Sequence, residues 1–240
     1  MVQISESWKK KVLPHGPLTK VAPGVWTVEG RLRPKGQMTR TMVVYQLPDG
    51  GLWLHSVVAL DPIALFELES IGEPKVLVVP NGMHRRDIAV YAERYPRARV
   101  VCPGVARAKV AEVVRVDAED KSVCAEYGIE VLSPRGIKPL ENVYGLPTSQ
   151  GKVLVFTDCL MNLPRLRGLE GFVLRLIGSA GFFGLTRVGK WVLLQDAAAY
   201  RGWLEEQSNR EDLKALTVGH GSAVTSDLRT AFLRAADRLR

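Results

Sequence analysis

The sequence predicts one α/β domain over residues 1–240, from three observations. Runs rich in β-forming residues alternate along the chain with stretches whose apolar residues recur at helical spacing. The length of 240 residues fits a single large domain, since α/β domains reach about 250 residues. The composition, 46% hydrophobic and 24% charged, is typical of globular proteins and excludes disorder as the main state.

The chain begins with short strands joined by turns. Residues 21–28 alternate around a Pro-Gly turn, and residues 41–47 form a β-rich run. The Pro-Asp-Gly-Gly sequence at 48–51 is a strong turn signal before a strand expected at 52–56. We therefore expect a meander or hairpin in this part of the chain.

A strand-helix-strand pattern follows the meander. Residues 61–71 predict a helix, because an Asp-Pro pair opens this stretch and supplies an N-cap and a favoured first helical residue. The apolar run at 75–79 is typical of a strand buried on both faces. A second helix is expected over 86–95, ending before a proline, and a second buried strand over 98–102.

The second half of the chain continues the alternation. A glycine-rich helical region is expected over 165–190, and a final helix from about residue 226. Further strands are predicted at residues 130–132, 143–146, 152–157 and 216–218.

Charge, cysteine content and targeting signals narrow the class of protein. The chain carries 33 Lys+Arg against 25 Asp+Glu, but the basic residues are scattered, which argues against nucleic-acid binding. The three cysteines are widely spaced without a Cys-X-X-Cys pair, so we expect neither a disulfide framework nor a cysteine zinc site. Because the sequence has no signal-peptide pattern and no uninterrupted apolar stretch of about 20 residues, we expect a cytoplasmic protein.

The segment at 165–190 combines Arg and Lys with Phe, Leu and Ile, a composition that interfacial membrane helices use. Six glycines interrupt it, and each glycine costs about 1 kcal/mol relative to alanine in a helix interior. These glycines argue against a long stable helix, so we expect a cover over a pocket or a dimer surface and no binding to a membrane surface. Phe182 and Phe183 make a homodimer worth testing.

Two motifs at the ends of predicted strands resemble those of a known superfamily. The first is Val-Leu-Val-Phe-Thr-Asp-Cys-Leu at 153–160, and the second is Thr-Val-Gly-His-Gly at 217–221. Both are similar to the late metal-binding motifs of the metallo-β-lactamase superfamily, and the resemblance extends over residues 18–223. It implies a four-layer αββα sandwich in a single domain, in a branch of that superfamily whose metal site is degenerate.

Most of the metal-binding positions that this resemblance implies hold other residue types. The four positions of the family's main motif, two histidines followed by an aspartate and a histidine, read Asn81, Met83, Arg85 and Arg86. Ile137 stands where the next histidine is expected, so Asp158 and His220 are the matches that remain. Two ligands cannot hold two metal ions, because even one zinc ion takes about four donors. We therefore expect that the dinuclear centre is lost and that no cofactor is bound.

Our leading interpretation is that fixed charge replaces metal in this pocket. A buried Asp158 requires a compensating partner, and we expect Arg85 or Arg86 to form an ion pair with it. The other guanidinium would bind a small anionic ligand, such as a carboxylate or a phosphate, in a protein that is not a hydrolase. The expected pocket residues are His55, Asn81, Arg85, Arg86, Asp158 and His220.

Two alternatives remain open. A one-residue shift within residues 80–87 gives His84 the place of a family histidine, with Asp87 on the same helix face. These two residues, together with Asp158 and His220, would hold one Zn, Fe or Mn ion in a mononuclear metal-dependent hydrolase. The remaining alternative is a structural or interaction protein whose pocket is vestigial.

Overall fold

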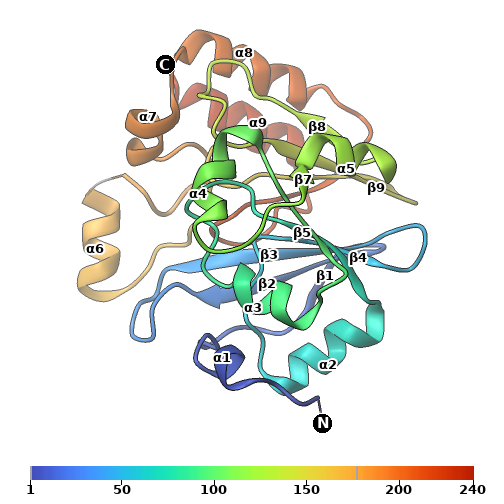
Figure 1. Cartoon of the computed structure of the whole chain (residues 1–240). Coiled ribbons are helices and arrows are strands. Elements are labelled where there is room, and N and C mark those ends of the chain that lie inside the picture. Colours follow the sequence, from blue (N-terminus) through green and yellow to red (C-terminus); the bar gives the residue numbers. More distant parts are fainter. Residues whose placement is uncertain (1, 177) are drawn as a thin grey trace.

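Two β-sheets pack face to face, with helices on both outer sides, in the computed structural model, which describes residues 2–176 and 178–240 (Figure 1). This arrangement confirms the αββα sandwich that the resemblance implies. The larger sheet has the strand order β1-β2-β3-β4-β5-β6-β7, and the smaller sheet has the order β11-β10-β9-β8.

The larger sheet changes from antiparallel to parallel pairing at β4. Its first four strands are the predicted meander, and β4 to β7 pair in parallel. In the smaller sheet β10 and β11 are parallel, while β8, β9 and β10 are antiparallel. The strands are β1 (Thr19–Ala22), β2 (Val25–Arg31), β3 (Thr39–Gln46), β4 (Leu52–His55), β5 (Pro74–Val78), β6 (Arg99–Cys102), β7 (Ala118–Glu119), β8 (Glu130–Leu132), β9 (Val143–Thr148), β10 (Gly151–Val155) and β11 (Leu213–Thr217).

Helices cover the outer face of each sheet. Buried residues of α1 to α4 join the apolar cluster on the larger sheet, and those of α7 to α9 join the cluster on the smaller sheet. The helices are α1 (Glu6–Lys9), α2 (Pro62–Ile71), α3 (Ile88–Arg94), α4 (Arg107–Ala111), α5 (Asp120–Glu126), α6 (Gly168–Leu176), α7 (Arg187–Leu193), α8 (Ala197–Ser208) and α9 (Leu228–Asp237). Within the described residues, none of these helices has the length and apolar composition needed to cross a membrane.

The larger sheet is buried on both faces, which explains its continuously apolar strands. In β3, Val43 and Tyr45 pack into the core between the sheets, while Met42 and Val44 pack against the helices. This alternation follows from the two-residue period of a strand. The core between the sheets also holds residues of β9, β10 and β11, so the two sheets share one apolar interior.

The helix at 61–71 begins where its sequence predicts. The carboxylate of Asp61 accepts hydrogen bonds from the N–H groups of Ile63 and Ala64, both at 2.9 Å, and Pro62 occupies the first turn. The next helix, expected from residue 86, starts only at Ile88, and the side chain of its N-cap residue, Asp87, makes no capping hydrogen bond. That side chain is bonded elsewhere.

Asp87 and Arg40 form a buried ion pair between α3 and the larger sheet. The Arg40 guanidinium donates to Asp87 Oδ2 and, at 2.8 Å, to the carbonyl of Val57. Asp87 Oδ2 also accepts the Ala59 N–H at 2.9 Å. The start of α3 is thereby tied to β3 and to the loop after β4, and the expectation that Asp87 serves as a metal ligand is wrong, since its carboxylate faces Arg40.

Replacing Asp87 with alanine should lower the free energy of unfolding by about 3–5 kcal/mol, because Arg40 would remain buried without a counter-charge. Urea denaturation followed by circular dichroism measures this loss. Asp49→Ala is the matched control: it removes the carboxylate of another ion pair, with Lys75, whose two side chains are both well exposed. The control should lose far less stability, and equal losses in the two variants would contradict this role of the Arg40–Asp87 pair.

Candidate metal centre

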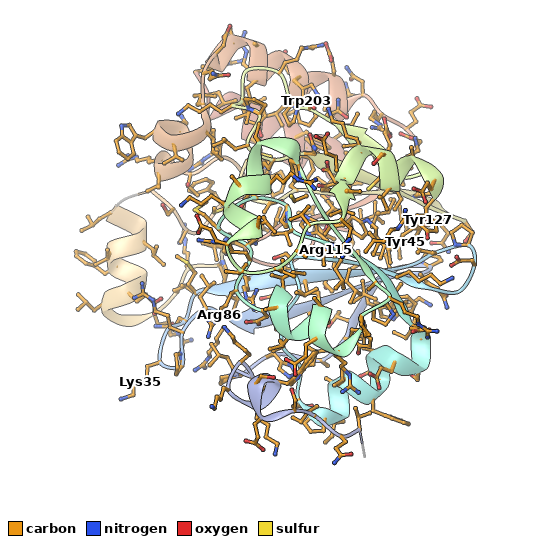
Figure 2. All side chains as sticks on the ribbon, viewed as in Figure 1. Lys35, Tyr45, Arg86, Arg115, Tyr127 and Trp203 are labelled. Carbon is orange, nitrogen blue, oxygen red and sulfur yellow. The ribbon has the colours of Figure 1, made fainter. Side chains whose placement is uncertain are left out.

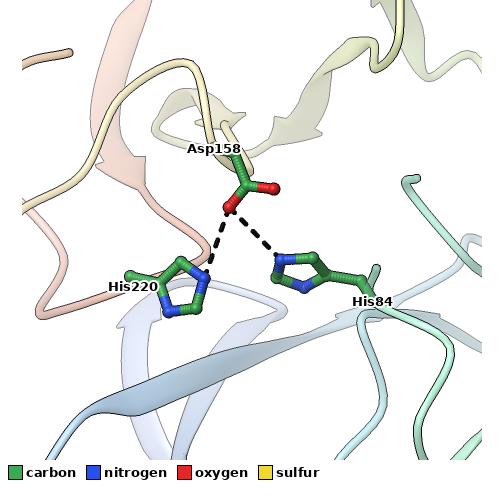
Figure 3. A group of neighbouring side chains, drawn as sticks. All are labelled: His84, Asp158 and His220. Atoms are coloured by element: carbon green, nitrogen blue, oxygen red, sulfur yellow. Dashed lines mark hydrogen bonds and ion pairs between the residues drawn. The ribbon is translucent and has the colours of Figure 1, made fainter. Parts of the chain in front are cut away.

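Three buried side chains converge at one end of the sandwich. His84 follows β5, Asp158 follows β10 and His220 follows β11, so both sheets contribute to the cluster. The Nε2 atoms of both histidines lie 3.3 Å from the same oxygen, Asp158 Oδ1 (Figure 3). Each residue offers one metal-ligating atom, and these atoms all lie within 4.8 Å of one another.

A side-chain turn at Asn81 directs His84 into the cluster. Asn81 Oδ1 accepts hydrogen bonds from the N–H groups of Met83 (2.9 Å) and His84 (3.2 Å), the pattern of an Asx turn. As a result Met83 is exposed, whereas the imidazole of His84 is buried. The structure thus has the loop register that gives His84, and not Met83, the inward position.

Both imidazoles are oriented through their second ring nitrogen. His220 Nδ1 lies 2.7 Å from the carbonyl oxygen of Thr39, so this nitrogen donates and Nε2 is the nitrogen that faces Asp158. His84 Nδ1 lies 2.7 Å from Ser56 Oγ. Ser56 has a φ of 54°, a left-handed conformation that is uncommon for a residue other than glycine, and it is held directly after β4.

The carboxylate of Asp158 is fixed from its other side. Asn81 Nδ2 donates to Asp158 Oδ2 at 2.8 Å, which leaves Oδ1 for the two histidines. Glu141 accepts the backbone N–H groups of Asp158 (2.9 Å) and Cys159 (2.7 Å), and it also accepts from Asn81 Nδ2 at 3.2 Å. One buried carboxylate, Glu141, and one amide, Asn81, therefore set the direction in which Asp158 points.

Burial and mutual interactions shift the pKa values of Asp158, His220 and Glu141. Burial disfavours the charged form of Asp158, yet His84 and His220 hold its pKa well below the ordinary value. Burial lowers the pKa of His220, but the hydrogen bond and charge of Asp158 reverse this and raise it. Burial and the charge of Asp158 raise the pKa of Glu141 to about 7. Asp158 is thus the group that carries negative charge at this site.

The two distances from Asp158 Oδ1 to the histidine nitrogens fit a metal ion. Charge-assisted hydrogen bonds are about 2.7–2.9 Å long, so contacts of 3.3 Å from Asp158 Oδ1 to both imidazoles are long for direct bonds. Ligand atoms around a tetrahedral zinc ion, at bonds of about 2.0–2.2 Å, lie about 3.3–3.5 Å apart. Two neutral imidazoles and a carboxylate are also ligand types that zinc and non-haem iron accept.

Arg85 and Arg86 point away from this cluster. Arg85 donates to the carbonyl of Lys109 at 2.5 Å and to Glu112 at 2.7 Å, and Arg86 donates to the carbonyl of Leu32. The expected ion pair between one of these arginines and Asp158 is therefore wrong. The physical reason is the turn at residues 81–84, which uses the inward position for a histidine and sends the next two residues outward.

His55 lies beside the cluster without joining it. Its ring is fully buried, 5.6 Å from the ring of Trp53 and 5.5 Å from that of Tyr144, and its Nε2 lies 3.3 Å from Thr157 Oγ1. Burial, followed by the nearby His84, lowers the pKa of His55 to about 3. Of the pocket residues expected from sequence, Asn81, Asp158 and His220 lie together, and Glu141, Ser56 and Thr39 are contributors that those expectations did not name as site residues.

The fold and the cluster define an α/β sandwich with a His/Asp centre where strands of both sheets end. No protein-family model and no curated protein matches the chain. Solved structures do: FIM-1 from Pseudomonas aeruginosa, in its mono-zinc form, is 14% identical with a TM-score of 0.61, covering 95% of this chain and 97% of that one. A metallo-β-lactamase from Erythrobacter litoralis, with beta mercaptoethanol in its active site, is 13% identical with a TM-score of 0.62 over 92% and 96%.

A further metallo-β-lactamase, from Pontibacter korlensis, is 15% identical with a TM-score of 0.57, covering 92% of this chain and 98% of that one. The similarity thus extends over nearly the whole of both chains in each case. This chain has the metallo-β-lactamase fold, which confirms the resemblance at the level of the fold.

The neutral, buried state of His55 predicts an acid-sensitive contribution to stability. The unfolded chain protonates this imidazole near pH 6.5, whereas the folded chain keeps it neutral down to about pH 3, so the free energy of unfolding should fall as pH drops through this window. The expected slope is up to about 1.4 kcal/mol per pH unit. Urea denaturation across the window should show a shallower slope for His55→Gln, and an unchanged slope would contradict the assignment.

Proposed function

We propose that the protein binds one divalent metal ion through His84, Asp158 and His220 and acts as a mononuclear metal-dependent hydrolase. The observation that carries this proposal is the pair of equal 3.3 Å distances from Asp158 Oδ1 to the two Nε2 atoms. Catalytic zinc sites take about three protein ligands and keep a position for water or substrate, which matches a three-ligand set.

An ion held in this way is a Lewis acid, which polarises a carbonyl or phosphoryl group and makes water more acidic. The residues of the chain would hold the ion in place. Asp158 would provide the negative charge, and the backbone carbonyl of Thr39, which accepts from His220 Nδ1, leaves Nε2 as the ligating nitrogen of the neutral ring. Asn81 and Glu141 hold Asp158 in a fixed orientation, so the ligand set exists before the ion binds.

A protein of this fold with a single metal ion is known, since one of the similar solved structures is a metallo-β-lactamase in its mono-zinc form. Anion binding by the arginines has less support. The guanidinium groups of Arg85 and Arg86 are bonded to protein oxygens away from Asp158. The histidines, by contrast, direct two nitrogens at one carboxylate oxygen.

Elemental analysis of purified protein should find about one zinc, iron or manganese ion per chain, reduced at least about tenfold in His84→Ala, Asp158→Ala and His220→Ala. Removal of any one ligand leaves two donors, which is too few for tight binding. Chelation should also lower the melting temperature of the wild-type protein, because the ion binds the folded state alone.

Two control variants sharpen this test. His15→Gln alters a histidine outside the cluster, whose Nε2 accepts the Asp61 N–H, and should retain the ion. Asp87→Asn, assayed at a temperature at which circular dichroism shows it to be folded, should also retain it, because that carboxylate faces Arg40. A protein that takes up no ion after reconstitution with all three metals would overturn the proposal and leave the cluster as a hydrogen-bonded His-Asp-His group.

Catalysis should follow the metal. Hydrolysis of a panel of aryl esters and phosphodiesters should disappear on chelation and return with the added ion, and Asp158→Ala should lower kcat/KM by about a hundredfold or more. The rates of His15→Gln, measured in parallel, should match those of the wild type. Stoichiometric metal without hydrolysis of any substrate in the panel would support the metal site and count against the hydrolase.

A further inference from the structure

Helix α6 presents an apolar face to solvent. Leu169, Phe172, Val173 and Leu176 are all exposed, and their spacing of three and four residues places them on one side of the helix. In Figure 1, α6 stands at the edge of the molecule, outside the two sheets. Monomeric soluble proteins rarely expose a contiguous apolar stripe of this kind without a partner for it.

The opposite side of α6 is anchored to the body of the protein. Glu170 accepts the N–H groups of Gln37 (2.8 Å) and Met38 (3.3 Å), and Gln37 Nε2 donates to the carbonyl of Arg167 at 2.9 Å. Leu174 packs in a small apolar cluster beside the helix. The exposed stripe is therefore held in a fixed direction by the loop between β2 and β3.

Helix α7 extends the apolar surface. Arg187, its first residue, donates through its guanidinium to the carbonyl of Leu176 at 3.3 Å, so the two helices are adjacent. Trp191 of α7 is 86% exposed, and Val188 is exposed as well. Tryptophan is one of the two residue types enriched at the boundary between lipid tails and water.

We call this surface the α6–α7 face, and its residues are Leu169, Phe172, Val173, Leu176, Val188 and Trp191. Exposed cations lie in the β2–β3 loop, just before α6 and at the start of α7. Within residues 2–176 and 178–240, none of these cations forms an ion pair with a carboxylate, so their charge is free to act on a partner. Figure 2 shows Lys35 extending outward on the same side as α6. The cations are Arg33, Lys35, Arg165, Arg167 and Arg187.

We propose that the α6–α7 face docks the protein on an anionic lipid surface. Two attractions hold interfacial helices at a membrane: burial of apolar side chains below the headgroups, and attraction of basic residues to negatively charged lipid. The α6–α7 face offers Phe, Leu and Trp for the first, and the nearby Arg and Lys residues offer the second. The glycines of this segment argue against a long helix, but they are compatible with α6, which is short and spans only Gly168–Leu176. The net charge of +8 adds to the attraction.

A second copy of the chain is a poorer occupant. A twofold dimer brings the same surface of both copies together, which would oppose the unpaired arginines and lysines around the stripe. Anionic lipid neutralises these cations instead. Charge complementarity therefore favours the membrane over self-association at this face.

Flotation of the full-length protein with vesicles tests the proposal. The protein should bind vesicles of phosphatidylcholine and phosphatidylglycerol at least about tenfold more tightly than vesicles of phosphatidylcholine alone, with binding weakened by salt. The emission of Trp191 should shift to shorter wavelength on binding, and Trp191→Phe should remove this shift. Phe172→Ser with Leu176→Ser should weaken binding about tenfold or more.

Phe66→Ser is the matched control, because Phe66 is also an exposed phenylalanine, 63% against 51% for Phe172, on the distant helix α2 among acidic residues. It should bind vesicles as the wild type does. Equal binding to both vesicle types, or equal loss in both Phe variants, would overturn the proposal. So would a wild-type dimer in sedimentation that Phe172→Ser dissociates, without any vesicle binding.

Discussion

Burial of the Asp158 carboxylate is the constraint on which this end of the fold depends. A charged group away from water requires hydrogen-bond donors or cations, and here its two oxygens face different partners: Asn81 on one side and two imidazoles on the other. Glu141 adds rigidity by accepting hydrogen bonds from two consecutive backbone N–H groups, those of Asp158 and Cys159. Because these partners come from three different loops, the loops must meet in one arrangement for the carboxylate to be satisfied.

The sandwich brings these loops together. Strands β4 and β5 of one sheet and strands β10 and β11 of the other are parallel neighbours, so the segments that follow them emerge at one end. Arg40 and Asp87 join the start of α3 to the larger sheet just beyond this cluster. The site therefore rests on rigid elements, and its ligand atoms need little movement to accept an ion.

Sequence patterns predicted the parts of this structure that depend on local preferences. The structure has these features where they were expected: the Asp-Pro start of α2, the buried strand β5, and the motifs that contain Asp158 and His220. The loop at 80–87 could not be assigned from sequence, because its register depends on hydrogen bonds to the Asn81 side chain and on where Arg40 lies. The role of Glu141 has no local signal either, since it depends on a contact with a strand end 17 residues away.

The central claim is that His84, Asp158 and His220 share one ion. Anomalous diffraction from a crystal of the metal-reconstituted protein tests it most directly. We expect a single anomalous peak about 2.0–2.2 Å from His84 Nε2, His220 Nε2 and an oxygen of Asp158. A map without such a peak, with both imidazoles drawn in to hydrogen-bond distance of Asp158, would contradict the account.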